Sequence, residues 1–318
     1  MDGFRIPVGQ WAETVVDVVG DALRGLFDAV ALVLGAVYDA VDAVLMAPPF
    51  WLLIIVLAAA AFAVSGWRLA LGTALGLLVI VGVDQWDNAM DTLALVIVAA
   101  LVAIVIAIPV GIWAARSDAV SRIVRPVLDF LQTMPAFVYL IPAIIFFGVG
   151  AVPGMIATIL FAIAPGVRLT ELGIRGVDSE VVEAGYAFGA SPARVLRQIQ
   201  IPLALPSIMA GVNQVIMLSL SMVVIAGMVG AGGLGGEIVR AIGRINVGLG
   251  FEAGLSVVMI AMILDRLTSA LGRPRAPRRA GAVRRTRNGG STARPSRGES
   301  AADTDRSADS TRMERTSA

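Results

Sequence analysis

The sequence predicts an all-α fold, a polytopic membrane helix bundle with about seven transmembrane helices. Of the 318 residues, 57% are hydrophobic and only 15% are charged, and the mean hydropathy is +0.83. A soluble domain of this size does not carry so apolar a surface. Long uncharged runs also recur along the chain, as helices that cross a bilayer require. We therefore divide the chain into residues 1–48, 49–272 and 273–318, of which the second part is the membrane domain.

The composition excludes most kinds of catalytic chemistry. All 25 basic residues are arginine, and the chain has neither cysteine nor histidine. Without lysine there is no GK[ST] phosphate loop and no Schiff base, and without Cys and His the usual metal ligands, thiol nucleophile and imidazole base are missing. We therefore expect no enzyme activity, no metal and no cofactor in this chain, so that any ATP hydrolysis must come from a partner.

The pattern of residues 1–48 predicts an amphipathic helix. It does not fit a signal peptide, because the acidic residues Asp2 and Glu13 interrupt the start of the segment. At 100° per residue one face, an arc of roughly 80°, collects nearly all of its charges. These are Glu13, Asp17, Asp21, Arg24, Asp28, Asp39 and Asp42. A narrow charged stripe beside a wide apolar face suits a helix at a membrane interface or packed on other helices.

Uncharged runs locate the membrane spans, which need roughly 20 residues each. The runs are 43–67, 69–83, 92–115, 130–167, 198–236 and 253–264. The run 130–167 would form a helix of roughly 57 Å and must fold back. The break is predicted at GVGAVPG (148–154), where glycines free the backbone and Pro153 stops the helix. If the last run extends upstream through 245–251, past Glu252, the count is seven.

Arginine positions predict the orientation. With the N-terminus outside, the inner side holds 21 of the 25 arginines and the outer side holds Arg5, Arg24, Arg240 and Arg244. The positive-inside rule favours this arrangement and places the multi-pass protein in the cell membrane with its C-terminus in the cytoplasm. Residues 273–318 are rich in Arg and Ser and almost free of apolar residues, so they predict a disordered cytoplasmic tail.

The polar loop between the fifth and sixth spans, EAGYAFGASPARVLRQIQIPLALP (183–206), is the most informative segment. It follows the charged stretch 175–183, breaks at Gly189 and restarts at Ser191 and Pro192, where a serine cap and a proline in the first turn begin a helix. We expect helix, turn and helix on the arginine-rich side, with the second helix ending at Pro202. Such a loop exposes a short helix to a cytoplasmic partner.

The same segment resembles the EAA loop of ABC importer permeases, in which E-A-A is followed by three residues, G, nine residues and I-x-L-P. We call residues 183–206 the EAA-like loop. The matching positions are Glu183, Ala184, Gly185, Gly189, Ile199, Ile201 and Pro202. Gly185 replaces the second alanine and Ile201 replaces leucine. In that family the loop docks into a groove of the ATP-binding subunit and couples nucleotide-driven closure to the translocation pathway.

The resemblance covers roughly residues 50–272. Within this range the sequence is similar to the glycine betaine/proline/choline branch of these permeases over residues 128–150, 188–235 and 262–268. It implies a type I permease subunit, without its own ATPase site, that imports quaternary ammonium or betaine osmolytes. It also implies a cytoplasmic ATP-binding subunit, an extracytoplasmic solute-binding protein and a second permease copy, the two copies forming a homodimer. The alternatives are a permease for methionine, phosphonate or sulfonate, and a secondary transporter; nucleic acid is not an expected partner.

Polar and aromatic residues inside the spans are candidates for the translocation path, because polar groups in a membrane face a cavity or another helix. They are Gln132, Thr133, Phe137, Tyr139, Asn213, Gln214, Ser219 and Ser221. Contacts between helices remain the alternative role for each. The motif GAGGLG (230–235) fits G-x-G-x-x-G, but it follows a membrane span and no strand, so we expect an outer turn and no dinucleotide site.

Overall fold

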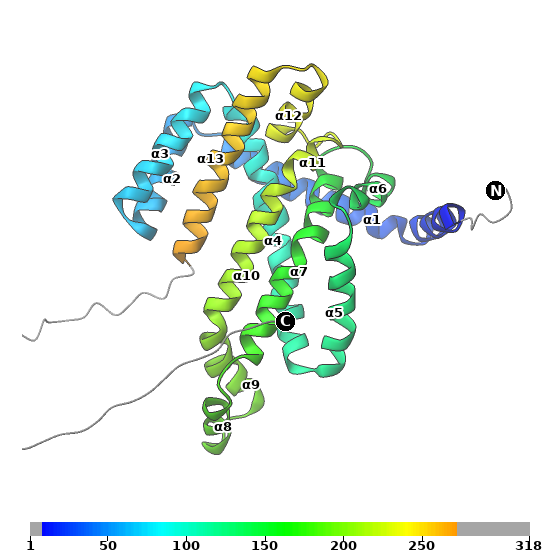
Figure 1. Ribbon diagram of the computed structural model, residues 1–318, viewed down its shortest axis with the longest axis vertical. Coiled ribbons are helices and arrows are strands. Elements are labelled where there is room, and N and C mark those ends of the chain that lie inside the picture. Colours follow the sequence, from blue (N-terminus) through cyan, green and yellow to red (C-terminus); the bar gives the residue numbers. More distant parts are fainter. Residues whose placement is uncertain (1–7, 272–318) are drawn as a thin grey trace, which may run out of the picture. The chain divides into compact units, whose positions relative to one another are not determined.

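The computed structural model describes residues 8–271 of the chain (Figure 1). Within this range every regular element is a helix, which confirms the predicted all-α class. The elements are α1 (Val8–Met46), α2 (Phe50–Ser65), α3 (Trp67–Gly82), α4 (Trp86–Arg116), α5 (Asp118–Thr133), α6 (Ala136–Phe147), α7 (Ala151–Arg175), α8 (Ser179–Ala187), α9 (Pro192–Val195), the π-helical segment Leu196–Gln200, α10 (Ile201–Ser221), α11 (Val223–Gly227), α12 (Gly233–Gly243) and α13 (Val247–Leu271). The tail predicted from residue 273 lies outside the described residues.

The centre of the bundle is formed by α4, α7 and α10, which lie side by side in Figure 1. Small residues bring α4 and α7 together. A Cβ atom on Gly111 would lie 2.6 Å from Thr170 Cβ, and one on Gly166 would lie 2.8 Å from Ala107 Cβ. Membrane helices gain their association from such close packing, because lipid supplies no hydrophobic driving force between them. These glycines therefore set the distance between the two central helices.

The long uncharged run 130–167 is broken twice, where the sequence predicted one break. At the unexpected break, α5 and α6 meet at 100°. Met134 has an extended backbone there, with ψ at 135°, because Pro135 disfavours the helical region for the residue before it. Residues 118–147 are therefore a bent pair of helices, α5 and α6, and not part of one straight span.

The predicted break between α6 and α7 is confirmed, and so is the role of its glycines, but Pro153 does not stop the helix. Gly148 and Gly150 take positive φ angles of 78° and 139°, which residues with a Cβ atom rarely adopt. Pro153, expected to stop the helix, lies in the first turn of α7. Proline is tolerated there because the backbone N–H groups of a first turn have no partner within the helix. The glycines therefore make this turn.

The run 198–236 also folds back, where the sequence predicted one span. The expected turn at GAGGLG (230–235) leads into α12, which packs closely on α11: a Cβ atom on Gly235 would lie only 2.1 Å from the carbonyl oxygen of Val223. At the start of α12 the N–H of Leu234 donates to Thr92 Oγ1 of α4 at 2.8 Å. The glycine motif thus allows the two short helices α11 and α12 to pack closely where they meet.

By length and composition, five described helices can cross a membrane, or six if the bent pair α5–α6 counts as one span. These helices include α1, which the sequence did not predict as a span, and leave out α2 and α3, which are apolar but have only 16 residues each. Helices α2 and α3 form a hairpin around Gly66 and pack beside α13 (Figure 1). The upstream extension of the last span is confirmed, since α13 begins at Val247 and includes Glu252.

The amphipathic segment forms one helix, α1, of 39 residues. Figure 1 shows α1 running across α4, α6 and α7, and not alongside them. Phe27 anchors it by stacking on Phe146 of α6, with ring centroids 4.5 Å apart. Along the predicted charged stripe Glu13, Asp17 and Asp28 are exposed, whereas Asp42 is half-buried, with an Oδ1 that has no partner among the described residues.

Candidate functional site

The first helix of the EAA-like loop, α8, has well-formed ends. At its start the carboxylate of Asp178 accepts a hydrogen bond from the N–H of Glu180 at 2.9 Å. At its end Gly189 has a φ of 78°, its N–H donates to the carbonyl of Tyr186 at 2.8 Å, and the next N–H donates to the carbonyl of Gly185 at 3.1 Å. This is a Schellman ending, which places a left-handed residue directly after the helix and favours glycine there. The predicted turn at Gly189 is confirmed.

The second helix starts at the predicted residue, although the Ser191 side chain forms no capping hydrogen bond, and it does not end where expected. Pro192 occupies the first turn of α9, and the helix then passes through π-helical residues 196–200 into α10. Pro202 lies in the first turn of α10. The wider π-helical turn changes the backbone pairing just before Pro202, so a proline that lacks an N–H does not stop the helix. The EAA-like loop is therefore continuous with a membrane helix.

Gly185 is the contact point between the two arms of the loop. A Cβ atom there would lie 2.6 Å from Ile199 Cδ1 and 3.4 Å from Val195 Cγ2, and Val195 is fully buried. An alanine at position 185 would therefore fit only if the flexible end of the half-buried Ile199 side chain moved aside. Gly185 and Ile199 hold the loop together internally.

The outer face of the loop is open. Glu183, Ala184 and Pro202 are exposed, Ile201 is half-buried, and Phe188 is 92% exposed at the tip. An exposed aromatic ring surrounded by small and polar residues is a feature of protein contact surfaces. Beside this face lies a groove between α8 and the ends of α4 and α7, which Glu183 and Arg175 both line.

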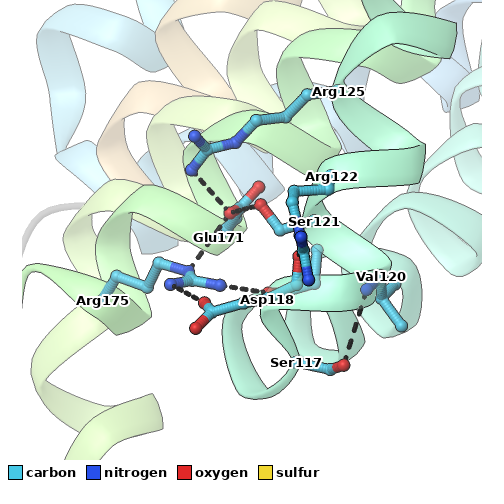
Figure 2. A network of polar contacts seen from close by, with 9 residues as sticks. Ser117, Asp118, Val120, Ser121, Arg122, Arg125, Glu171 and Arg175 are labelled. Atoms are coloured by element: carbon cyan, nitrogen blue, oxygen red, sulfur yellow. Dashed lines mark hydrogen bonds and ion pairs between the residues drawn. The ribbon is translucent and has the colours of Figure 1, made fainter.

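A buried carboxylate connects the base of the loop to α5 (Figure 2). Glu171 of α7 is 3% exposed. Its Oε1 accepts hydrogen bonds from Ser121 Oγ at 2.7 Å and Arg125 Nη2 at 2.8 Å, both on α5, and pairs with Arg175 Nε at 3.2 Å. We call Glu171, Ser121, Arg125, Arg175 and Asp118 the α5–α7 cluster. A buried carboxylate requires such partners, because its desolvation is costly without them.

Arg175 makes this cluster continuous with the loop. Its Nη1 pairs with Asp118 Oδ1 of α5 at 2.7 Å, and its Nη2 donates to the carbonyl of Ala114 in α4 at 2.8 Å. Arg175 is the last residue of α7 and precedes α8 by only three residues. The chain is therefore bonded to both α4 and α5 at the end of α7, just before the helix that carries the start of the EAA-like loop.

The candidate path residues fall into two groups. Tyr139, Asn213 and Ser219 have partners inside the protein: Tyr139 donates to the Leu131 carbonyl, Asn213 donates to Asp265 of α13 at 3.3 Å, and Ser219 donates to the Val215 carbonyl at 2.9 Å. The other members are exposed in the single chain, although Thr133 and Ser221 also donate to backbone carbonyls of their own helices. They are Gln132, Thr133, Phe137, Gln214 and Ser221.

Sequence reasoning missed the α5–α7 cluster. Arg168, Glu171 and Arg175 repeat at spacings of three and four, which places them on one face of a helix and was a usable signal. The partners Asp118 and Ser121 are about 50 residues away in the chain. Only the fold of α5 against α7 brings them together.

The chain is similar to known membrane transport proteins. Residues 107–275 match the family described as binding-protein-dependent transport system inner membrane component. The chain is 47% identical to the glycine betaine/carnitine transport permease protein of Listeria monocytogenes over 84% of this chain and 96% of that protein. It is 46% identical to the glycine betaine/proline betaine transport system permease protein of Escherichia coli, covering 84% of this chain and 76% of that protein.

A solved structure shares the fold at low sequence identity. The inward-facing methionine ABC transporter MetNI matches with a TM-score of 0.55 and 21% identity, covering 59% of this chain and 94% of the matched chain. The match covers nearly the whole of that shorter chain, so this protein has helices in addition to the shared core.

Proposed function

The chain belongs to the family of binding-protein-dependent transport system inner membrane components, and we propose that it is the permease of an ATP-driven importer for quaternary ammonium and betaine osmolytes. In this role the chain forms the membrane pathway and hydrolyses no ATP itself. Its partners are a cytoplasmic ATP-binding subunit, an extracytoplasmic solute-binding protein and a second copy of the same permease. Its N-terminus is outside and its C-terminus is in the cytoplasm.

The observation that carries the coupling role is the exposed loop whose base is bonded into the bundle. The tip at Phe188 is open to a partner. Arg175, at the base, is bonded to α4 and to α5, and α5 continues into the bent α6. A force applied to α8 therefore has a short, bonded route to the broken helix pair, which supports a mechanism in which the ATP-binding subunit moves α5 and α6 through this loop.

The solute class is supported by the relatives, whose names specify glycine betaine, carnitine and proline betaine as transported compounds. These solutes carry a methylated cationic nitrogen with diffuse charge. The predicted path residues are uncharged, and such a route suits a zwitterion that loses its hydration at low cost better than a strongly hydrated anion. A permease for another small solute, such as methionine or a phosphonate, is the second candidate.

Uptake measurements test the proposal. Labelled glycine betaine, choline and proline are supplied to cells that lack other osmolyte importers and express this chain with or without its ATP-binding subunit and binding protein. We expect uptake of at least one of the three only when all components are present. Uptake of methionine or a phosphonate, and none of these three, would contradict the solute class and leave the family assignment unchanged.

A further inference from the structure

A cleft with one polar and one apolar end lies between the α2–α3 hairpin and the C-terminal half of α13. This cleft has a volume of about 530 Å³. Its polar end contains Ser65, Arg68, Asp265, Arg266 and Ser269, and its apolar end is lined by Met259 and Ile263. The Asp265 carboxylate accepts hydrogen bonds from Asn213 and Ser269, so the two arginines leave this end with a net positive charge. Within residues 8–271 neither arginine forms an ion pair. The cleft therefore has a positively charged end and a hydrophobic end.

The depth of the cleft in the membrane follows from its neighbours. Trp67 adjoins Arg68 at the start of α3, is 63% exposed, and lies 5.7 Å from the guanidinium carbon of Arg68. Exposed tryptophan at the end of an apolar helix marks the level of the lipid headgroups. Beyond Arg68, α3 has no charged residue. The positive end is thus at the headgroup level and the apolar end is in the hydrocarbon.

Thr73 supplies an independent sign that the cleft receives a ligand. It lines the cleft and is 1% exposed, yet its Oγ1 has no hydrogen-bond partner. Buried polar groups are nearly always paired, and in a membrane water cannot supply the partner. Thr73 follows Arg68 by five residues, roughly 7.5 Å along the helix axis. The oxygen is covered and unpaired among residues 8–271, so a ligand with an acceptor at that distance from its anionic group would satisfy the hydroxyl after a rotation of the Thr73 side chain.

The apolar part of the cleft has room for a chain of methylene groups. A Cβ atom on Gly72 would meet nothing within 4 Å. One turn deeper, a Cβ on Gly76 would only touch Ile263 and Met259, at 3.4 and 3.6 Å. Along α3 the cleft is therefore a short channel that is open at the exposed Gly72 and closed by α13 at the buried Gly76.

We propose that this cleft binds one anionic phospholipid of the cytoplasmic leaflet. Its phosphate lies between Arg68 and Arg266, an ester carbonyl accepts from Thr73, and one acyl chain follows the channel over Gly72. The chain's own C-terminal segment is a poor occupant, because it carries nine arginines between residues 273 and 297 before its first acidic residue, Glu299. Like charges would oppose its approach to the two arginines, whereas a lipid phosphate complements them.

Binding is tested on the full chain in detergent, with Trp67 as the reporter. The other four tryptophans are replaced by phenylalanine, and phosphatidylglycerol with brominated chains is titrated until it quenches Trp67. Phosphatidylcholine with the same chains is the matched lipid, and glycerol phosphate tests the headgroup alone. We expect phosphatidylglycerol to quench at a several-fold lower concentration than phosphatidylcholine, and glycerol phosphate not to displace it.

Two variants and a control separate the parts of the site. Arg68→Gln with Arg266→Gln should weaken the binding of phosphatidylglycerol by on the order of 30-fold, from about fivefold for each arginine. The binding of phosphatidylcholine should weaken less, because its choline cation offsets the charge of its phosphate. Gly72→Leu fills the channel without a clash and should weaken the binding of both lipids. Arg122→Gln removes an exposed arginine outside the cleft and should change neither.

Three results would overturn the proposal. The first is equal quenching by the two lipids in the unmodified protein. The second is displacement of phosphatidylglycerol by glycerol phosphate, which would make the site a general anion site. The third is an equal loss of phosphatidylglycerol affinity in Arg122→Gln and in the double variant. That result would show that affinity depends on the net charge of the protein and not on this cleft.

Discussion

Replacing Glu171 by glutamine removes the charge at the centre of the α5–α7 cluster and keeps the shape of the side chain. Oε1 of Glu171 is the common acceptor of Ser121, Arg125 and Arg175. The neutral amide retains one carbonyl acceptor, so it cannot serve three donors with charge-assisted strength. We expect α5 to loosen from α7 while α4, α7 and α10 stay packed.

The magnitude depends on how far water can replace the lost contacts. Breaking a buried ion pair by removing one partner costs about 3 to 5 kcal/mol. Here the side chain of Arg125 is 59% exposed and that of Arg175 is 32% exposed, so both guanidinium groups regain water, and Arg175 keeps Asp118. We therefore expect Glu171→Gln to lower the unfolding free energy by about 2 to 4 kcal/mol.

The control lies on the same two helices. Asp129 of α5 pairs with Arg168 of α7, and both side chains are exposed, at 63% and 40%. Exposed pairs contribute about 0 to 1 kcal/mol, so Asp129→Asn should change little. Thermal unfolding of the purified chain should give a midpoint lower by on the order of 10 °C for Glu171→Gln and by a few degrees at most for Asp129→Asn. Equal shifts in the two variants would refute the assignment of the buried cluster as the main link.

Three further predictions concern the loop, the tail and the orientation. Gly189→Val should leave the protein inserted but reduce solute-stimulated ATP hydrolysis, because a β-branched residue at a φ of 78° costs about 1 to 2 kcal/mol and displaces the turn; normal coupling in proteoliposomes would contradict this. Deleting residues 274–318 should preserve uptake, since a segment that buries little apolar area does not shape the pathway; loss of uptake despite normal insertion would be the opposite result. Reporter fusions after residues 90, 180 and 280 should read outside, inside and inside, and a periplasmic reading at 280 would reverse the orientation.

Composition and periodicity predicted the helical class, and residue chemistry predicted the turn at Gly189 together with the start of the second helix at Pro192. These are local properties, because a left-handed glycine and a proline in a first turn depend only on the backbone near them. The breaks were harder to predict. Hydropathy does not distinguish a straight apolar helix from one bent at Met134 and Pro135, and Pro153 was misread because proline stops a helix from within but is tolerated in its first turn.

The site was predictable only where its residues are adjacent in the chain. The EAA-like loop was found because its pattern spans about 20 consecutive residues. The packing of Gly185 against Ile199 was not foreseen, since it depends on the angle between two arms. The bond from Glu171 to Ser121 joins residues separated by 50 positions, and no local pattern predicts such a pair.

The central claim, that the exposed tip of the EAA-like loop contacts the ATP-binding subunit, can be tested directly because the chain has no cysteine. A single cysteine introduced as Phe188→Cys, at a position 92% exposed, is joined to a photoactivatable cross-linker in the assembled complex. Val149→Cys, 78% exposed in the turn before α7, at the other end of that helix, is the matched control. The account predicts a cross-link from position 188 to the ATP-binding subunit and none from position 149. No cross-link from 188, or equal cross-links from both positions, would contradict it.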